Sequence, residues 1–304
     1  METQKQETSI DVYSIVTNRI IELLEQGTVP WQKPWTSAGI PRNLLSKRPY
    51  QGINILLLNS LSYEHNLFLT WKQVKTIGAS VKKGEKGHLI VFNKMVEKEE
   101  HGEKKKKFFL RYYKVFNISS CTDIPIEFLP KEGAVFEKIT TCDVVVEDMP
   151  LRPNITIGGN QAYYDPKQDV VNMPPIKKFK GAEKYYSVLF HELVHSTGHE
   201  SRLSRKEVTG KIVFGSEEYS LEELTAEIGA CYLKSYTGIV VDHFEQSAAY
   251  ISNWLEVLKH DKRFIIQAST RAQKAVDFIL NKKEDDQQEI SDENIPKADE
   301  VESF

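Results

Sequence analysis

The feature that most constrains this chain is the histidine-rich stretch FHELVHSTGHESRL at residues 190–203. His191 and His195 are four residues apart, a spacing that places both imidazoles on one face of a helix, one turn apart. Glu192 lies between them, so the stretch contains an HExxH pattern. The apolar residues SVLF before this pattern and LV within it indicate a helix that packs against the rest of the protein. The stretch therefore predicts a buried helix that presents two ligands to one metal ion.

The HExxH pattern combines the groups that metal-assisted hydrolysis needs. Zinc takes nitrogen or oxygen ligands in a tetrahedral set, and catalytic zinc sites leave one position for water. The ion lowers the pKa of that water, and an adjacent carboxylate can accept its proton. We therefore predict His191 and His195 as zinc ligands and Glu192 as the general base.

His199 lies on the same helical face but is a poor candidate for the third ligand. Three ligands in a row along one helix would span about 12 Å at a rise of 1.5 Å per residue, which is too far for a single ion. A metzincin-type pattern would place the third histidine at position 201, where this chain has Ser201. We expect His199 to lie at the helix end or beside a ligand, rather than on the metal.

The stretch SLEELTAEIGACYL, residues 220–233, offers a third ligand on a second helix. Glu223 and Glu227 are four residues apart on one face of this helix. In glutamate-type zincins the first carboxylate of such a pair binds the metal and the second orients a metal-bound histidine, which predicts these roles for Glu223 and Glu227. Alternatively, Ser220 and Glu223 form a capping box, and Glu227 is then the ligand.

Length and composition are those of a globular protein with room for two domains. The chain has 304 residues, with 40% hydrophobic and 27% charged residues. Its three cysteines are far apart and odd in number, which argues against a disulfide framework. No apolar run reaches membrane-spanning length, and the polar N-terminus lacks the features of a signal peptide. We expect a cytoplasmic protein with no membrane partner.

The order of the expected elements indicates an α+β protein with two domains. Helices are predicted at residues 10–26, 182–199, 221–237, 243–259 and 262–281, strands at 87–97 and 106–119, a hairpin at 162–174, and a helix or buried strand at 54–61. Proline and glycine at 128–133 suggest domains of residues 1–132 and 133–282, each with a core of its own. Residues 283–304 are acidic and poor in apolar residues, which predicts a disordered tail.

The segment between Trp71 and Lys114 is strongly basic and rich in aromatic residues. It holds twelve Lys and one Arg against five Glu. A positive surface with exposed rings suits unpaired nucleic acid, because lysines neutralise phosphates and rings stack on bases. Alternatively, the rings belong to the cores of strands and Lys104–Lys107 form a solvated hairpin tip. Composition alone leaves both interpretations open.

The chain resembles the ArdC-type antirestriction proteins of conjugative plasmids and mobile elements. The resemblance rests on the segments PWQKPW, PRNLLSKRPYQGIN, FLTWKQVKTIGASVKKGEKGHLIVF, YYKVFN, AYYDPKQDVVNMP, HELVHSTGHESRL and EELTAEIGA, in this order. They lie within residues 10 to 280, and only the charged stretch before RYYKVFN departs from the pattern. The resemblance implies an N-terminal domain that binds single-stranded DNA and a C-terminal zincin-like metallopeptidase domain with zinc as its cofactor.

The resemblance also favours particular residues. It supports the nucleic-acid interpretation of the basic segment, and the residues expected to contact DNA are Arg48, Trp71, Lys72, Lys82, Lys83, Lys86, Arg111, Tyr113 and Lys114. The run that begins at Glu223 is similar to the third-ligand segment of ImmA/IrrE-type zincins, which favours Glu223 over Glu227 as ligand.

The function implied by the resemblance is protection of incoming single-stranded DNA from host restriction. A second hypothesis is a regulatory zinc peptidase that cleaves one protein partner, with DNA serving only to localise it. A third is a structural or vestigial zinc site. Tyr163, Tyr164 and His199 are candidates for stabilising a transition state, and no spacing rule selects among them.

Overall fold

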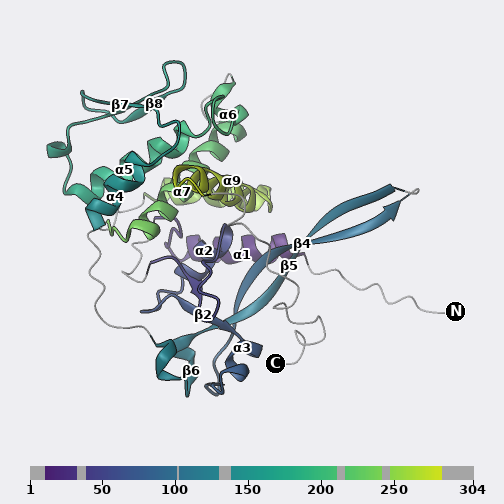
Figure 1. The fold of residues 1–304 in the computed structure, drawn as a ribbon. Helices are drawn as coiled ribbons and strands as arrows, with labels where there is room; N and C mark the ends of the chain where they lie inside the picture. Colours follow the sequence, from purple (N-terminus) through teal and green to yellow (C-terminus); the bar gives the residue numbers. More distant parts are fainter. Residues whose placement is uncertain are drawn as a thin grey trace.

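The computed structural model describes residues 11–32, 39–100, 103–129, 138–210, 216–241 and 247–282 (Figure 1). The predicted acidic tail and the predicted domain boundary at 132/133 lie outside these residues. Helices and strands are mixed in both halves, so the predicted α+β class is confirmed. All three cysteines are buried.

The N-terminal half is built around a four-stranded sheet with the strand order β1-β2-β5-β4. Its strands are β1 (Arg42–Asn43), β2 (Leu67–Thr70), β4 (His88–Glu100) and β5 (Glu103–Asn117), and its helices are α1 (Val12–Glu25), α2 (Ile53–Asn59) and α3 (Trp71–Thr76). A second, two-stranded sheet pairs β3 (Ser80–Val81) with β6 (Cys121–Thr122). The segment whose periodicity left helix and strand open is therefore the helix α2.

The charged stretch between the two long strands is itself part of the sheet. β4 continues to Glu100 and β5 begins at Glu103, and the far half of this ribbon extends away from the body of the protein (Figure 1). In the antiparallel register Lys104 is opposite Glu99, and Lys106 is opposite Glu97. Lys104–Lys107 therefore belong to the strand β5.

The C-terminal half places a small sheet over a group of helices. The sheet has the order β7-β9-β8, and its strands are β7 (Asn154–Ile157), β8 (Tyr163–Asp165) and β9 (Val170–Met173). The helices are α4 (Lys138–Glu147), α5 (Ala182–Ser196), α6 (Lys206–Thr209), α7 (Glu217–Thr237), α8 (Ala248–His260) and α9 (Phe264–Ile279). β8 and β9 form the predicted hairpin and both pack against α5, while α7 packs against α5 and α9.

The two ends of α7 are fixed by local sequence. Its N-cap is Ser216, whose side chain accepts a hydrogen bond from the Tyr219 amide, so the helix begins one turn earlier than predicted. Ser220 therefore lies inside the helix, and the alternative of a capping box with Glu223 is wrong. The helix ends at Gly238, which has a φ of +71°, a left-handed conformation that glycine adopts at little cost.

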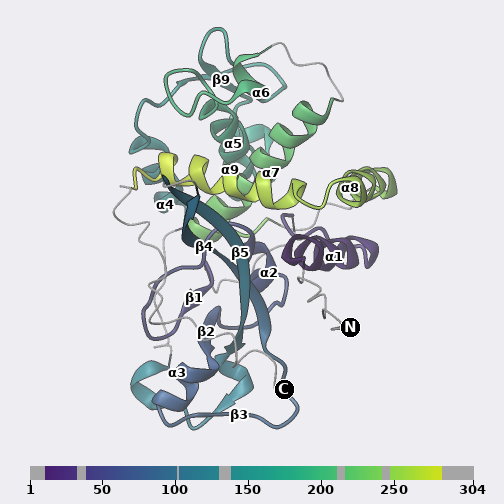
Figure 2. The same cartoon turned by 90° about the vertical axis from the view of Figure 1, so that its right-hand side faces the viewer.

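The hydrophobic core is shared between the two halves. Buried residues of α1 and α2 belong to the same cluster as those of α5, α7, α8 and α9, and Figure 2 shows α1 lying beside α8. The Tyr232 hydroxyl of α7 donates to the Gly52 carbonyl at 2.6 Å, and the Trp31 indole donates to the Tyr250 hydroxyl at 3.2 Å. Among the described residues, two smaller clusters belong to the N-terminal half alone. The expectation of a separate core for each half is therefore wrong for α1 and α2.

Candidate metal centre and basic surface

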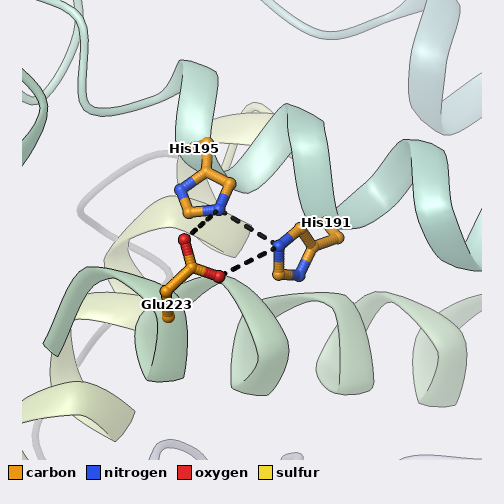
Figure 3. Close-up of side chains that lie close together, drawn as sticks. All are labelled: His191, His195 and Glu223. Atoms are coloured by element: carbon orange, nitrogen blue, oxygen red, sulfur yellow. Dashed lines mark hydrogen bonds and ion pairs between the residues drawn. The ribbon is translucent and has the colours of Figure 1, made fainter. Parts of the chain in front are cut away.

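Two helices bring the predicted metal ligands together. α5 carries His191 and His195, and the antiparallel α7 carries Glu223; Figure 3 shows the three side chains pointing toward one another. The helices approach closely where Gly229 faces Val194, because a Cβ atom at Gly229 would lie 2.7 Å from a Val194 methyl carbon. Gly229, in the run of small residues after Glu223, therefore allows the close approach of α5 and α7.

The spacing of the ligand atoms fits one divalent metal ion. The two Nε2 atoms of His191 and His195 are 3.1 Å apart, and they lie 3.7 and 3.6 Å from the Glu223 carboxylate oxygens. With zinc–ligand distances of 2.0–2.2 Å, neighbouring ligand atoms of a tetrahedron are about 3.4 Å apart. Two imidazole nitrogens and one carboxylate oxygen also suit this metal chemically, and three ligands leave a position for water. The residues present therefore fit the ion that the HExxH pattern implies.

Glu192 is buried beside this cluster, with 8% of its surface exposed. Burial raises the pKa of its carboxyl above the ordinary value, and the nearby Glu223 charge acts in the same direction. The Tyr164 backbone N–H of β8 hydrogen-bonds to the carboxylate and opposes this effect. A carboxylate with a raised pKa is a stronger proton acceptor, which suits the predicted role of general base.

The carboxylate that contacts a site histidine on the side of its ring away from the other ligands is Glu222, not the predicted Glu227. A Glu222 oxygen lies 3.0 Å from Nδ1 of His195. Glu227 accepts hydrogen bonds from the Gln32 amide at 2.6 Å and from the Tyr250 hydroxyl at 2.7 Å. Consecutive residues of a helix point in directions about 100° apart, so Glu222 points to a different side of His195 than Glu223 does. Glu227 lies one helical turn beyond Glu223, where it contacts Tyr250 of α8.

The two histidines differ in their ionisation. Burial and the neighbouring His195 lower the pKa of His191 to about 3, so its ring is neutral at neutral pH. Burial also acts to lower the pKa of His195, but the hydrogen bond and charge of Glu222 outweigh burial and raise it. A neutral His191 offers a lone pair, as a metal ligand must.

A cavity of about 460 Å³ adjoins His191 between α5 and α7. Its walls include Glu227 and Lys234 of α7, Tyr250 of α8, and Trp31 and Gln32 from the segment after α1. The N-terminal half therefore builds part of the wall of the cavity beside the metal cluster.

The candidates for stabilising a transition state have other partners. The Tyr164 hydroxyl donates to Asp169 at 2.9 Å, Tyr163 is half exposed, and His199 lies beyond the end of α5 in contact with Ser201. Tyr219, which sequence reasoning missed, hydrogen-bonds through its phenol to the Glu223 carboxylate. The sequence shows the four-residue spacing between Tyr219 and Glu223, but the helix was predicted to begin at residue 221. Both residues lie on one helix because α7 begins at Glu217.

An exposed tryptophan marks the basic surface of the N-terminal half. Trp71 opens α3, is 40% exposed, and packs against Phe116 of β5 with ring centroids 5.7 Å apart. The Lys75 ammonium lies 5.1 Å from the Trp71 ring, a cation that was not among the predicted DNA contacts. Lys114 and the Phe116 ring both lie against Gly87, because a Cβ atom there would touch both.

Most of the other predicted DNA contacts are on the surface, and one is not. The exposed residues are Arg48, Lys72, Lys82, Lys83, Lys86, Arg111 and Lys114. The Lys82 ammonium donates to the Ser119 carbonyl at 2.7 Å. Tyr113 is 6% exposed and packs against Phe92, and burial raises its pKa to about 12. The prediction that Tyr113 contacts DNA is therefore wrong, because its ring faces the core side of β5.

Fold and site together define a two-part protein with a zincin-like metallopeptidase domain. A family model described as a zincin-like metallopeptidase matches residues 148–271, and the N-terminal domain of the anti-restriction factor ArdC matches residues 10–116. The metal-free crystal structure of the antirestriction protein ArdC from the R388 plasmid superposes with a TM-score of 0.73 at 37% identity, over 89% of this chain and 97% of that one. The Mn(II)-bound structure of the same protein gives a TM-score of 0.71.

Two curated relatives extend the comparison. An uncharacterized protein, y4eC, of Sinorhizobium fredii is 34% identical over 92% of this chain and 95% of its own length. A DNA primase TraC of Escherichia coli is 31% identical over 88% of this chain, which spans only 20% of that longer protein. This chain belongs to the ArdC antirestriction family.

Proposed function

We propose that this protein protects single-stranded DNA of a mobile element from host restriction and carries a zinc peptidase site. Membership in the ArdC family supports the antirestriction role. The observation that carries the peptidase part is the convergence of His191, His195 and Glu223 within 4.8 Å of one another, with Glu192 buried beside them. We propose zinc as the ion, because the ligand set is that of glutamate-type zinc peptidases, while a relative holds Mn(II).

In the proposed reaction each residue of the cluster has a separate task. The ion, when bound, lowers the pKa of a water molecule and polarises the peptide carbonyl. Glu192 accepts the proton of the attacking water and returns it to the leaving amine. Glu222 fixes the ring of His195 through Nδ1. The cavity beside His191 is large enough to receive a side chain of the substrate, and its mixed apolar and charged walls would orient that side chain.

The proposed DNA site is the surface around Trp71. An exposed ring next to Lys75, with the exposed Lys114 two residues from the Phe116 ring that Trp71 packs against, combines base stacking with phosphate neutralisation. Glu85, the acidic residue of the neighbouring lysine-rich turn, accepts a hydrogen bond from the Ser120 hydroxyl at 2.9 Å. Glu85 is thereby held on the Ser120 side of the turn, while Lys83 and Lys86 remain exposed.

The proposed setting is the cytoplasm of the recipient cell. Within the part of the chain that the structure describes, no helix has the length and apolar character needed to cross a membrane. Single-stranded DNA is the proposed partner, and a protein substrate of the peptidase site is a second.

The test compares wild type with Glu192→Ala in two assays. The first measures cleavage of casein and of a fluorogenic peptide library by the zinc-loaded protein; the second measures survival of transferred plasmid DNA in restricting and non-restricting recipient cells. We expect Glu192→Ala to abolish cleavage and to keep protection, because the DNA surface is separate from Glu192. Loss of protection in the variant would favour the alternative of a regulatory peptidase. A wild type that gives no protection would refute the proposed role.

A further inference from the structure

Arg205, the residue immediately before α6, is buried against the back of the metal cluster with 8% of its surface exposed. Its Nε and Nη2 atoms donate to the two carboxylate oxygens of Glu222 at 2.8 and 2.7 Å. Nη1 donates to the Thr197 hydroxyl at 2.7 Å, and Nη2 also donates to the Val194 carbonyl at 2.8 Å. The guanidinium is therefore fixed by hydrogen bonds through all three nitrogens, and it forms a bidentate ion pair with Glu222.

This ion pair makes Glu222 a hydrogen-bond acceptor for the Nδ1 atom of His195. Glu222 is 4% exposed, and both of its oxygens accept hydrogen bonds from the Arg205 guanidinium, the geometry of an ion pair with an ionised carboxylate. An ionised carboxylate only accepts hydrogen bonds, so Nδ1 of His195 carries the proton that it shares with Glu222. In the neutral ring that a metal ligand requires, the lone pair is then on Nε2, which faces His191 and Glu223.

The chain is shaped to bring Arg205 to this place. A Cβ atom at Gly198 would lie 2.4 Å from a methyl carbon of Val208 and 3.1 Å from Nη2 of Arg205. Only glycine therefore lets the turn after α5 close over the end of that helix. In the closed turn Arg205 reaches the Val194 carbonyl at the end of α5, which also accepts hydrogen bonds from the Thr197 hydroxyl and amide.

We propose that Arg205 is a positioning residue of the metal centre, which acts through Glu222 to fix the ring and the tautomer of His195. This inference rests on the proposed metal site. The requirement is for arginine and not only for positive charge, because a lysine ammonium cannot engage both oxygens of Glu222 and the Thr197 hydroxyl in one plane.

Arg202 provides a matched control in the same turn. Its side chain is 1% exposed and is also paired to a carboxylate, that of Asp169. It donates to the Ser196 carbonyl at 2.7 Å, and none of its hydrogen bonds goes to Glu222 or to either site histidine. Arg202→Lys therefore removes a buried arginine ion pair of the same kind without touching the connection to His195.

The experiment measures the affinity of the full chain for Zn²⁺ by competition with a chromophoric chelator. Wild type is compared with Arg205→Lys, Glu222→Gln, the double variant and Arg202→Lys, and the melting temperature of each metal-free protein is recorded. We expect Arg205→Lys to weaken Zn²⁺ binding about 10- to 100-fold, the range for partners that orient a metal-bound histidine, and Arg202→Lys to leave it unchanged. The Co²⁺ absorption spectrum should change in Arg205→Lys and not in Arg202→Lys.

The double variant shows whether Arg205 acts through Glu222. When two residues act as one unit, the effects of their substitutions on the binding free energy do not add. The double variant should therefore bind Zn²⁺ no more weakly than Glu222→Gln alone. Full additivity, or wild-type affinity in Arg205→Lys, would overturn the inference. A wild type that binds no Zn²⁺ would instead refute the metal site itself. If Arg205→Lys does not fold, Thr197→Val tests the same connection in a folded chain; a smaller loss of affinity is expected, and an unchanged affinity would overturn the inference.

Discussion

Glu222 and Glu223 are neighbours in the sequence and approach His195 from opposite sides of its ring. Glu223 lies 3.6 Å from Nε2, the nitrogen that faces His191, whereas Glu222 lies 3.0 Å from Nδ1. Two carboxylates on consecutive residues of one helix can reach a single imidazole in this way because they diverge by about 100°. The helix α7 thus carries both the proposed ligand Glu223 and the carboxylate that contacts the proposed ligand His195.

The first prediction concerns which glutamate, Glu223 or Glu227, is the third metal ligand, a choice that the residues alone left open. Purified wild type should contain about one zinc ion per chain, because three protein ligands and a water complete a tetrahedron. Glu223→Ala should lose most of this zinc, whereas Glu227→Ala should keep it, since Glu227 bonds to Gln32 and Tyr250. The measurement is elemental analysis after dialysis. A full site in Glu223→Ala would contradict the ligand assignment.

The second prediction concerns the rings of the basic surface. Trp71→Ala should weaken binding to a single-stranded oligonucleotide by about 1–3 kcal/mol, the range for loss of one stacking ring. Tyr113→Phe is the matched control and should bind as wild type does, because Tyr113 is buried. Fluorescence anisotropy at several salt concentrations, with the same sequence as duplex for comparison, measures both effects. Equal affinity for duplex and single strand would reject the stacking surface.

At the scale of single elements, the pairing of Asp169 with Arg202 ties the turn between β8 and β9 to the turn after α5. Nη1 of Arg202 donates to Asp169 at 3.0 Å, and a second bond joins Nη2 to the same carboxylate. Burial acts to raise the pKa of Asp169, but the hydrogen bonds from Arg202 and Tyr164 outweigh burial and lower it. Protonation of Asp169 in the folded protein therefore requires a lower pH than in the unfolded chain.

The third prediction follows from the sign of this shift. A lowered folded-state pKa contributes stability above the unfolded value of about 3.9, and this contribution is lost as the pH falls through the folded-state pKa. Asp169→Asn should therefore reduce the free energy of unfolding at pH 7, and its difference from wild type should shrink below about pH 4. Urea unfolding at a series of pH values measures this. A difference that stays constant with pH would exclude the ion pair as its source.

The sequence predicted the elements well where one periodicity dominated. The apolar spacing of residues 10–26 and the stop at Gly27 predicted α1, and the HExxH spacing predicted the helix face that carries His191 and His195. What it could not supply were facts that depend on neighbours in space. The role of Glu222 requires knowing where α7 lies against α5, and the burial of Tyr113 requires knowing which face of β5 is covered. Arg205 lies in a turn that has no periodicity to analyse.

At the scale of the whole molecule, the two halves are joined by more than a linker. Gln32, from the segment after α1, donates to Glu227 on α7, one turn beyond the proposed ligand Glu223. Trp31 packs edge-on against Trp254 of α8, with ring centroids 5.9 Å apart. The sequence suggested two separable modules, because each half has enough apolar residues for a core. It does not reveal that the apolar residues of α1 and α2 pack against the helices of the other half.

The fourth prediction is that the N-terminal half is not stable by itself. A fragment of residues 1–133 would expose the apolar faces of α1 and α2 that pack against α8 and α9. We expect it to aggregate or to show no cooperative melting. A fragment of residues 1–282, which keeps the whole shared core, should melt as the full chain does. Circular dichroism and size-exclusion chromatography measure both, and a monomeric 1–133 fragment with a cooperative transition would contradict the shared core.

The most direct test of the metal centre is anomalous diffraction from crystals of the zinc-loaded protein, recorded on both sides of the zinc absorption edge. We predict one strong peak about 2 Å from Nε2 of His191, from Nε2 of His195 and from a carboxylate oxygen of Glu223, as zinc–ligand distances require. Glu192 should lie close to the peak without binding it. A peak coordinated by His199 or Glu227, or no peak between α5 and α7, would contradict the proposed site.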